Sequence, residues 1–252
     1  MWSSFYLRGM DWPNQCAAAI PCLNEAGHIA AVVRGVRLYL PSVFVVDDGS
    51  SDGTAPAAEA AGAQVLRHST NRGKGAALAT GWAEARRRGF RWVLCLDGDG
   101  QHDPADIPAL LVRAAQTGAE LVVGNRFYNG HAEVPLLRRA VNRWMSRQLS
   151  RLAGAVLPDT QCGFRLLDLE LHRRLELATR RFEIESELLV AALAAHARVE
   201  FVPIRTIYKA GPSKIEPVTD AWRWWRWWWR QGGGARGRQT HPAAASLEAS
   251  RQ

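Results

Sequence analysis

A run of about 18 uncharged apolar residues, the length that a helix needs to span a membrane, is absent from this 252-residue sequence. The N-terminus, with Arg8 and Asp11 close to its only apolar stretch, lacks the layout of a secretory signal. We therefore expect a cytoplasmic protein that neither spans a membrane nor is exported.

Cysteine is scarce, with only four residues in the chain: Cys16, Cys22, Cys95 and Cys162. Their spacings match no zinc-binding or redox pattern, and two of them sit inside apolar runs. We interpret all four as buried, reduced thiols.

Two common nucleotide-binding signatures are missing as well. The sequence contains neither Gly-x-Gly-x-x-Gly nor Gly-x-x-x-x-Gly-Lys-Ser/Thr, and residues 73–75 (GKG) resemble the second pattern only superficially. These absences weaken the hypotheses of a nicotinamide-dependent dehydrogenase and a Walker-type ATPase. No internal repeat is visible either.

What is present is an alternation of short apolar runs with longer Ala-rich segments. Strands that are apolar at successive positions are typical of a parallel sheet covered by helices on both faces. We predict strands at residues 16–20, 43–46, 64–66, 92–96, 121–123 and 199–204, and helices at 25–40, 54–61, 74–88, 104–117, 136–153 and 184–197. The pattern predicts an α/β, doubly wound fold with a mostly parallel, Rossmann-like sheet.

The composition, 47% hydrophobic and 22% charged, is that of an ordinary soluble domain. We expect a lead of residues 1–14, a single domain over 15–220, an amphipathic helix over 221–231 and a disordered tail over 232–252. Residues 221–252 hold six Arg and one Glu, and so supply +5 of the net charge of +8. A basic tail favours an acidic partner such as anionic lipid or nucleic acid.

Ligands of such sheets bind beyond the carboxyl ends of the strands, where this sequence has four polar motifs. They are PCLNE (21–25), DDGSSDGT (47–54), NRGKG (71–75) and DGDGQHDP (97–104). In the last, Asp97 and Asp99 can converge with a diphosphate on one hard divalent cation, which is the chemistry of Mg²⁺ or Mn²⁺.

Ordinary turn and cap chemistry is an alternative for these acidic motifs. Asp103 has the position of a helix N-cap, and Asp52 or Ser51 could cap the helix after the second motif. An EF-hand calcium loop does not fit, because His102 and Pro108 occupy the positions of its required Gly and Glu.

The order of the motifs resembles that of the family 2 glycosyltransferases of GT-A fold, and within them the dolichyl-phosphate and polyprenyl-phosphate mannose synthases. The matching segments are IPCLNE (20–25), VVDDGSSDGT (45–54), NRGKG (71–75), LDGDGQH (96–102), GNR (124–126) and CGFR (162–165). The resemblance implies an inverting, metal-dependent transfer of a hexose from a nucleotide diphosphate sugar, of GDP-mannose or UDP-glucose type, to an acceptor such as a polyprenyl phosphate.

The resemblance also implies roles for individual residues. It places Pro21, Leu23, Glu25, Val46, Asp48, Lys74 and Asp97 in the donor-binding site, and Lys214 among the ligand-binding residues in a loop near the acceptor. It implies Asp97, Asp99 and Gln101 as ligands of Mg²⁺ or Mn²⁺, and Asp97, Asp99, Arg126, Arg165 and Asp159 as catalytic residues. Leu23 departs from the aromatic residue of many members, and Pro212 from the Arg often found before Ser-Lys.

Arg126 and Arg165 would face the diphosphate or the acceptor phosphate, since a planar guanidinium offers paired donors. Alternatively, Arg126 is a surface cation and Arg165 pairs with Asp159 or Asp168. A lipid phosphate acceptor needs no general base, whereas for a hydroxyl acceptor Asp159 is the candidate base, unless it is a cap or an arginine partner.

Three further carboxylates, Glu183, Glu185 and Glu187, lie at the predicted start of a helix. The helix dipole favours carboxylates there, so we assign them no catalytic role.

The tail sequence WRWWRWWWR (222–230) places its arginines in one stripe of a helix, with Trp222, Trp224, Trp225, Trp228 and Trp229 opposite. Tryptophan favours the membrane interface and arginine favours anionic headgroups, so we predict peripheral attachment to the inner face of a membrane. The alternative is a helix packed on the domain. No nucleic-acid recognition module accompanies the tail, so nucleic acid is not an expected partner.

Two functions of other classes stay open at this point. A sugar-1-phosphate nucleotidyltransferase shares the acidic metal site but should begin with a Gly-rich loop, which residues 21–25 lack. A non-catalytic membrane-associated adaptor would explain the tail but not the acidic motifs. The sequence does not identify the sugar, the base, the acceptor or the oligomeric state.

Overall fold

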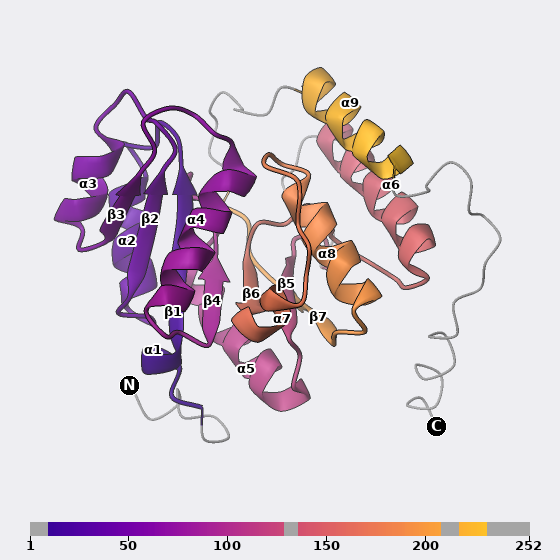
Figure 1. Ribbon diagram of the computed structural model, residues 1–252, viewed down its shortest axis with the longest axis horizontal. Helices are drawn as coiled ribbons and strands as arrows, with labels where there is room; N and C mark the ends of the chain where they lie inside the picture. Colours follow the sequence, from indigo (N-terminus) through magenta and orange to yellow (C-terminus); the bar gives the residue numbers. More distant parts are fainter. Residues whose placement is uncertain (1–9, 129–135, 208–216, 231–252) are drawn as a thin grey trace.

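A seven-stranded sheet forms the centre of the computed structural model, which describes residues 10–128, 136–207 and 217–230 (Figure 1). The strands are β1 (Cys16–Cys22), β2 (Val43–Asp47), β3 (Gln64–Arg67), β4 (Trp92–Cys95), β5 (Leu121–Asn125), β6 (Arg165–Asp168) and β7 (Val199–Pro203). The helices are α1 (Trp12–Gln15), α2 (Ile29–Arg37), α3 (Thr54–Ala60), α4 (Lys74–Arg87), η2 (Pro104–Asp106), α5 (Ile107–Thr117), α6 (Leu136–Ala153), α7 (Leu169–Arg173), α8 (Ile184–Ala194) and α9 (Pro217–Trp228).

The strand order is β3-β2-β1-β4-β6-β5-β7, and β6 alone runs antiparallel to its neighbours β4 and β5. The predicted α/β fold with a mostly parallel sheet is therefore confirmed, and each predicted strand and helix is present. The pattern misses β6, because this four-residue strand begins with the charged Arg165. It also misses the short helices α1 and α7.

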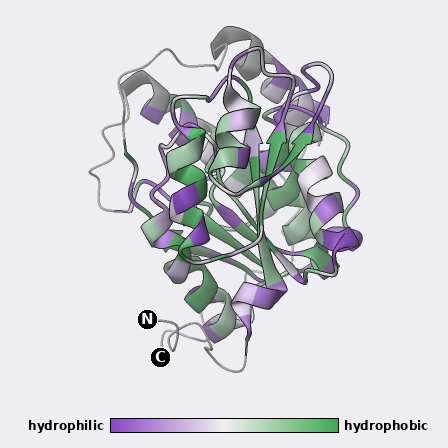
Figure 2. Cartoon of the chain, turned by 90° about the vertical axis from the view of Figure 1, so that its left-hand side faces the viewer, coloured by the Kyte–Doolittle hydropathy of each residue, from purple (hydrophilic) through white to green (hydrophobic). Residues whose placement is uncertain are grey.

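Helices cover both faces of the sheet because alternate residues of a strand point to opposite sides. A Cβ added to Gly81 of α4 would lie 2.9 Å from the side chain of Ala19, so α4 packs on that face of β1. The next residue, Ile20, faces the other way, toward Ile29 of α2 beside Gly98. Figure 2 shows the same layering as a largely hydrophobic sheet within more hydrophilic outer surfaces.

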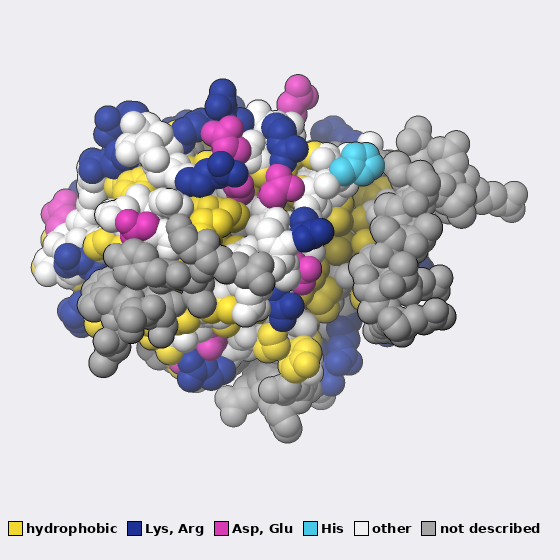
Figure 3. All heavy atoms as spheres, turned by 90° about the horizontal axis from the view of Figure 1, so that it is seen from below, with side chains coloured by type: hydrophobic (Ala, Val, Ile, Leu, Met, Phe, Trp, Pro, Cys, Tyr) yellow, Lys and Arg dark blue, Asp and Glu magenta, His cyan; other side chains and the backbone are white. Residues whose placement is uncertain are grey.

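The loop chemistry predicted around α5 is also present. Asp103 accepts a hydrogen bond from Ala105 N at 2.9 Å, as an N-cap does, and Gly118 ends α5 in the left-handed conformation with φ of 68°. Seen from below, the surface intersperses basic and acidic side chains (Figure 3). Among the ion pairs of the described residues, one joins Arg205 and Asp106 at 3.1 Å.

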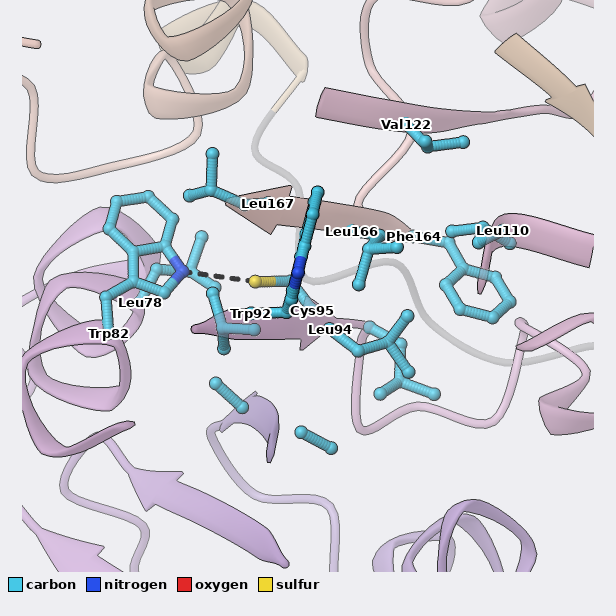
Figure 4. Close-up of a cluster of buried hydrophobic side chains, with 14 of the residues drawn as sticks. Leu78, Trp82, Trp92, Leu94, Cys95, Leu110, Val122, Phe164, Leu166 and Leu167 are labelled. Carbon is cyan, nitrogen blue, oxygen red and sulfur yellow. Dashed lines mark hydrogen bonds between the residues drawn. The ribbon is translucent and has the colours of Figure 1, made fainter. Parts of the chain in front are cut away.

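The core lies between β4, β6 and the helices on either side, where Leu94, Phe164 and Leu166 are fully buried (Figure 4). Trp82 of α4 satisfies its indole N–H there by donating to Cys95 Sγ at 3.1 Å. All four cysteines are free and buried, as predicted. Burial raises the pKa of Cys95 to about 11, which keeps its thiol protonated and unreactive.

Helix α9 lies alongside α6 at one end of the molecule (Figure 1). Trp224 and Trp227 are only 3% and 8% exposed, and the Trp224 ring contacts Trp144 of α6 with 5.7 Å between centroids. The side of α9 that carries Trp224 and Trp227 is therefore packed on the domain, as the predicted alternative states. The predicted disordered tail over residues 232–252 lies outside the described residues.

The other side of α9 remains exposed to solvent. Trp222, Trp225 and Trp229 are 55%, 44% and 56% exposed, and we call these three residues the exposed tryptophan face. No helix in the described parts of the chain is long and apolar enough to cross a membrane.

Because Leu166 is fully buried in a strand at the centre of the sheet, Leu166→Ala should lower the free energy of unfolding by about 2–5 kcal/mol. Leu38→Ala is the matched control, since Leu38 is 69% exposed and its loss should change little. Urea unfolding measures both variants. Equal effects would contradict this description of the core.

Candidate functional site

The first two polar motifs are locked together where β1 and β2 end. Residue Cys22 pairs with Asp47 in the parallel register, so the loops after the two strands begin side by side. Ser50 Oγ then accepts from Asn24 N at 2.8 Å, and Thr54 Oγ1 accepts from Glu25 N at 2.7 Å. The hydroxyls of the second motif thus fix the backbone of the first.

Asp48 holds the third motif in the same way. Its carboxylate is 4% exposed and accepts from Arg72 N at 2.9 Å and Gly73 N at 2.8 Å, while His68 Nδ1 lies at 2.7 Å. Both oxygens are therefore engaged within the protein. Asp48 thus has a structural role, and its predicted place in the donor-binding site stays a prediction. The sequence offered no signal for His68 as its partner.

The glycines of the third motif allow another segment to approach closely. A Cβ on Gly75 would lie 2.7 Å from the carbonyl carbon of Arg180, whose oxygen accepts from Ala76 N at 3.1 Å. Packing of the backbone explains this glycine without a phosphate ligand. An open hollow of about 400 Å³ lies nearby, lined by Gly49, Ser50, Arg67, His68 and Ser69.

The fourth motif meets Lys74 in a cluster that the sequence did not predict as a whole. Lys74 Nζ lies 2.6 Å from Asp97 Oδ1 and 2.6 Å from Glu185 Oε1. Burial alone lowers the pKa of Lys74, but the charges of Asp97 and Glu185 outweigh it and raise that pKa above its ordinary value. Glu185, 5% exposed, thus has a site role that the sequence analysis did not assign.

A glycine completes this cluster from the opposite side. A Cβ on Gly163 would lie 2.8 Å from Asp97 Oδ2 and 3.0 Å from Lys74 Nζ. A larger residue would require the Asp97 carboxylate to shift and would crowd the Lys74 ammonium group. The CGFR segment therefore contributes through its glycine, for which the sequence analysis assigned no role.

Among the carboxylates of the fourth motif, Asp99 is the one whose negative charge is least balanced by positive groups nearby. Burial, and then the charge of Asp97, raise its pKa to about 6, and its Oδ1 accepts from Gln101 N at 2.9 Å. Two carboxylates that repel each other at a strand end offer the hard oxygen donors that Mg²⁺ and Mn²⁺ prefer. Within the described residues, however, no three His, Cys, Asp or Glu side chains form a metal site. A cation here would need oxygens from a bound diphosphate as well.

Arg126 and Asp159 form a second charged pair. Arg126 Nε lies 2.7 Å and Nη2 2.9 Å from the two carboxylate oxygens of Asp159, which is fully buried. The alternative of a surface cation is wrong for Arg126, whose side chain is 17% exposed. Burial raises the pKa of Asp159, but the charge of Arg126 outweighs this and holds it below its ordinary value, so the arginine-partner alternative describes Asp159 better than a general base does.

The Arg165 guanidinium donates hydrogen bonds to backbone carbonyl oxygens. The residue is 2% exposed and donates to the carbonyl oxygens of Cys162 at 2.7 Å, Glu185 at 2.6 Å and Thr160 at 2.9 Å. These bonds do not support the predicted contact with a phosphate, and the alternative pairing with Asp159 or Asp168 is wrong. Arg165 instead joins the loop before β6 to the start of α8.

The remaining predicted residues divide into three groups. Pro21, Leu23 and Glu25 lie at the end of β1 with partial exposure, beside the second motif. Val46 is 1% exposed and packs in the core toward Gly81, so it is placed to shape the site only indirectly. Lys214 lies outside the described residues.

Comparisons with known proteins give one coherent result. A sequence model described as "Glycosyl transferase family 2" matches residues 18–175. The UDP-N-acetylglucosamine–dolichyl-phosphate N-acetylglucosaminyltransferase of Methanococcus voltae is 29% identical over 75% of this chain and 84% of its own length. The undecaprenyl-phosphate mannosyltransferase of Micrococcus luteus is 29% identical over 81% of this chain and 91% of its own length.

Among solved structures, the glucosyl-3-phosphoglycerate synthase of Mycobacterium tuberculosis in complex with Mg²⁺ and uridine diphosphate is similar with a TM-score of 0.66. The two chains are 23% identical, and the match covers 84% of this chain and 77% of the other. This likeness confirms the predicted GT-A fold.

The raised pKa of Asp99 predicts a pH dependence of stability in metal-free protein without nucleotide. The native state binds the Asp99 proton more tightly than the unfolded state, so this group lowers stability as pH rises from about 4 to about 6. Asp99→Asn removes the ionisable group and with it this decrease in stability. Its stability advantage over the unmodified protein should grow across this interval in urea unfolding, and a constant difference would contradict the assignment.

Proposed function

The chain belongs to glycosyl transferase family 2, and from this premise we propose that it transfers a hexose from a nucleotide diphosphate sugar to a polyprenyl phosphate at a membrane surface. The observation that carries the proposal is the cluster of Asp97, Asp99, Lys74 and Glu185 where the sheet strands end. That edge is where folds of this type bind nucleotides. Two relatives named as transferases to dolichyl and undecaprenyl phosphate support the acceptor class.

On the donor side, the fourth motif would hold the diphosphate. Asp97 and Asp99, with Gln101 nearby, are the residues that would bind Mg²⁺ or Mn²⁺, and the ion would supply positive charge next to the departing diphosphate. Lys74 holds Asp97 in place and brings a permanent ammonium group to the same spot. GDP-mannose and UDP-glucose types of donor both fit such a site.

The burial of Asp159 and its ion pair with Arg126 favour a phosphate acceptor over a hydroxyl acceptor. A hydroxyl must lose its proton to a base, yet Asp159, the base candidate, is fully buried and bound through both oxygens to Arg126. A lipid phosphate brings an oxygen that is already anionic near neutral pH. That oxygen would form a bond to the anomeric carbon as the bond to the diphosphate breaks, which inverts the configuration.

The surface of α6 and α9 supports action at a membrane. Beside the exposed tryptophan face, Arg226 and Arg230 of the tail are exposed, and Arg226 lies over the Trp222 ring at 4.9 Å. On α6, Trp144 is 46% exposed and Arg147 is exposed as well. Aromatic rings at headgroup depth beside cationic groups match an anionic interface.

Nucleotide binding tests the donor site directly. GDP, UDP and dTDP, each with and without Mn²⁺, should be compared for their effect on the melting temperature of the full chain. We expect one nucleotide to stabilise the protein only with Mn²⁺, and Asp97→Ala with Asp99→Ala to remove that shift. No shift with any nucleotide would contradict the proposal.

Sedimentation with vesicles tests the membrane surface. Replacing the exposed tryptophan face by serine (W222S, W225S and W229S) should abolish co-sedimentation with vesicles that contain anionic lipid, because the interfacial anchors are lost. Leu38→Ala, a change at a remote exposed apolar residue, is the control. Binding of the triple variant equal to that of the control would rule out this surface.

A further inference from the structure

A row of hydrogen-bonded polar side chains connects α6, the loop before β6, α8 and α9. It lies next to the candidate site. Ser146 Oγ lies 3.2 Å from Thr160 Oγ1 and accepts from Thr160 N at 3.2 Å. Gln161 Nε2 donates to Ser186 Oγ at 2.8 Å, and Trp224 Nε1 donates to the same oxygen at 2.9 Å. We call these five residues the polar chain.

The polar chain adjoins both charged pairs of the site. The residue before Thr160 is Asp159, which binds Arg126. The residue before Ser186 is Glu185, which binds the Lys74 ammonium group. A shift of the loop or of the first turn of α8 would therefore move a carboxylate that holds a cation of the site.

Trp224 is the contact through which α9 reaches the polar chain. Trp224 and Trp227 are both buried against the domain, at 3% and 8% exposure. The Trp227 indole nitrogen has no hydrogen-bond partner among the described residues, whereas the Trp224 nitrogen donates to Ser186. The two side chains thus share size and burial but differ in this bond.

We propose that Trp224 is a positioning residue, which aligns both charged pairs of the site through its bond to Ser186 and the bond between Ser186 and Gln161. This inference rests on the proposed function for the reaction that it serves. Trp224 holds this bond while α9 is packed on the domain, so the seating of α9 on α6 and the alignment of the site are linked through one side chain.

The size of the effect follows from the environment of the bond. Ser186 is fully buried, so without the indole donor its oxygen loses a partner that water cannot replace. Loss of one such hydrogen bond corresponds to a change of about three- to tenfold in the population of the aligned state. Fold and nucleotide pocket should survive, because Lys74 and Arg126 keep their direct partners.

The test compares Trp224→Phe and Ser186→Ala with Trp227→Phe in the full chain. Trp227→Phe removes the same atoms from a buried ring but no hydrogen bond to Ser186. Two measurements apply: hydrogen exchange of the amides of residues 159–162, and sugar transfer to polyprenyl phosphate in anionic vesicles from the hexose ester of the nucleotide diphosphate that binds. The Phe and Ala variants should raise exchange and lower kcat by about three- to tenfold, with little change in the KM for donor.

Trp227→Phe should leave both quantities unchanged. The double variant Trp224→Phe with Ser186→Ala should be no worse than Ser186→Ala alone, because Ser186→Ala already removes the bond from Trp224 together with the bond from Gln161. If Trp224→Phe behaves like Trp227→Phe in exchange and in kcat, the inference is overturned. If the unmodified protein transfers no sugar, the proposed function fails, and hydrogen exchange alone decides whether Trp224 orders the loop.

Discussion

The contact of Lys74 with Asp97 and Glu185 is the interaction on which the rest of the site depends. It joins the start of α4, the loop after β4 and the start of α8 at one point. A buried ammonium group between two carboxylates keeps the net charge small, which makes burial of all three groups tolerable. Gly163 then brings the loop before β6 against the same cluster.

Carboxylates and hydroxyls of the acidic motifs accept hydrogen bonds from backbone amides of neighbouring loops. Asp48 holds the loop at Arg72 and Gly73, and Thr54 holds Glu25 N. These bonds lie at the ends of β1 and β2, where the chain leaves the sheet and its amides have no strand partner. A rigid set of loops at this edge is what a phosphate-bearing ligand needs, since little has to be ordered on binding.

The sequence was sufficient for the fold because hydrophobic periodicity and glycine positions are local signals. It predicted which edge of the sheet holds the candidate site and that Asp97 and Asp99 lie close together there, since both follow from the position of a strand end. It did not predict the contacts that Asp48 and Arg165 make within the protein, because ligand contacts and structural contacts require the same residue types. The site role of Glu185 was not predicted for another reason. Its partner Lys74 is 111 residues away in the sequence, and no periodic pattern indicates such a contact.

The reversed direction of β6 has a consequence for how this protein could diversify. Since β6 starts where β4 and β5 finish, the chain between β5 and β6, which includes α6, leaves and re-enters the sheet at the same edge. The part of this segment around α6 can change in length and composition without disturbing the motifs after β1 to β4, provided that Gly163 keeps its place against Asp97 and Lys74. Under the proposed function, selection for a new acceptor would act on one excursion of the chain, while the motifs proposed to bind the donor are inherited intact.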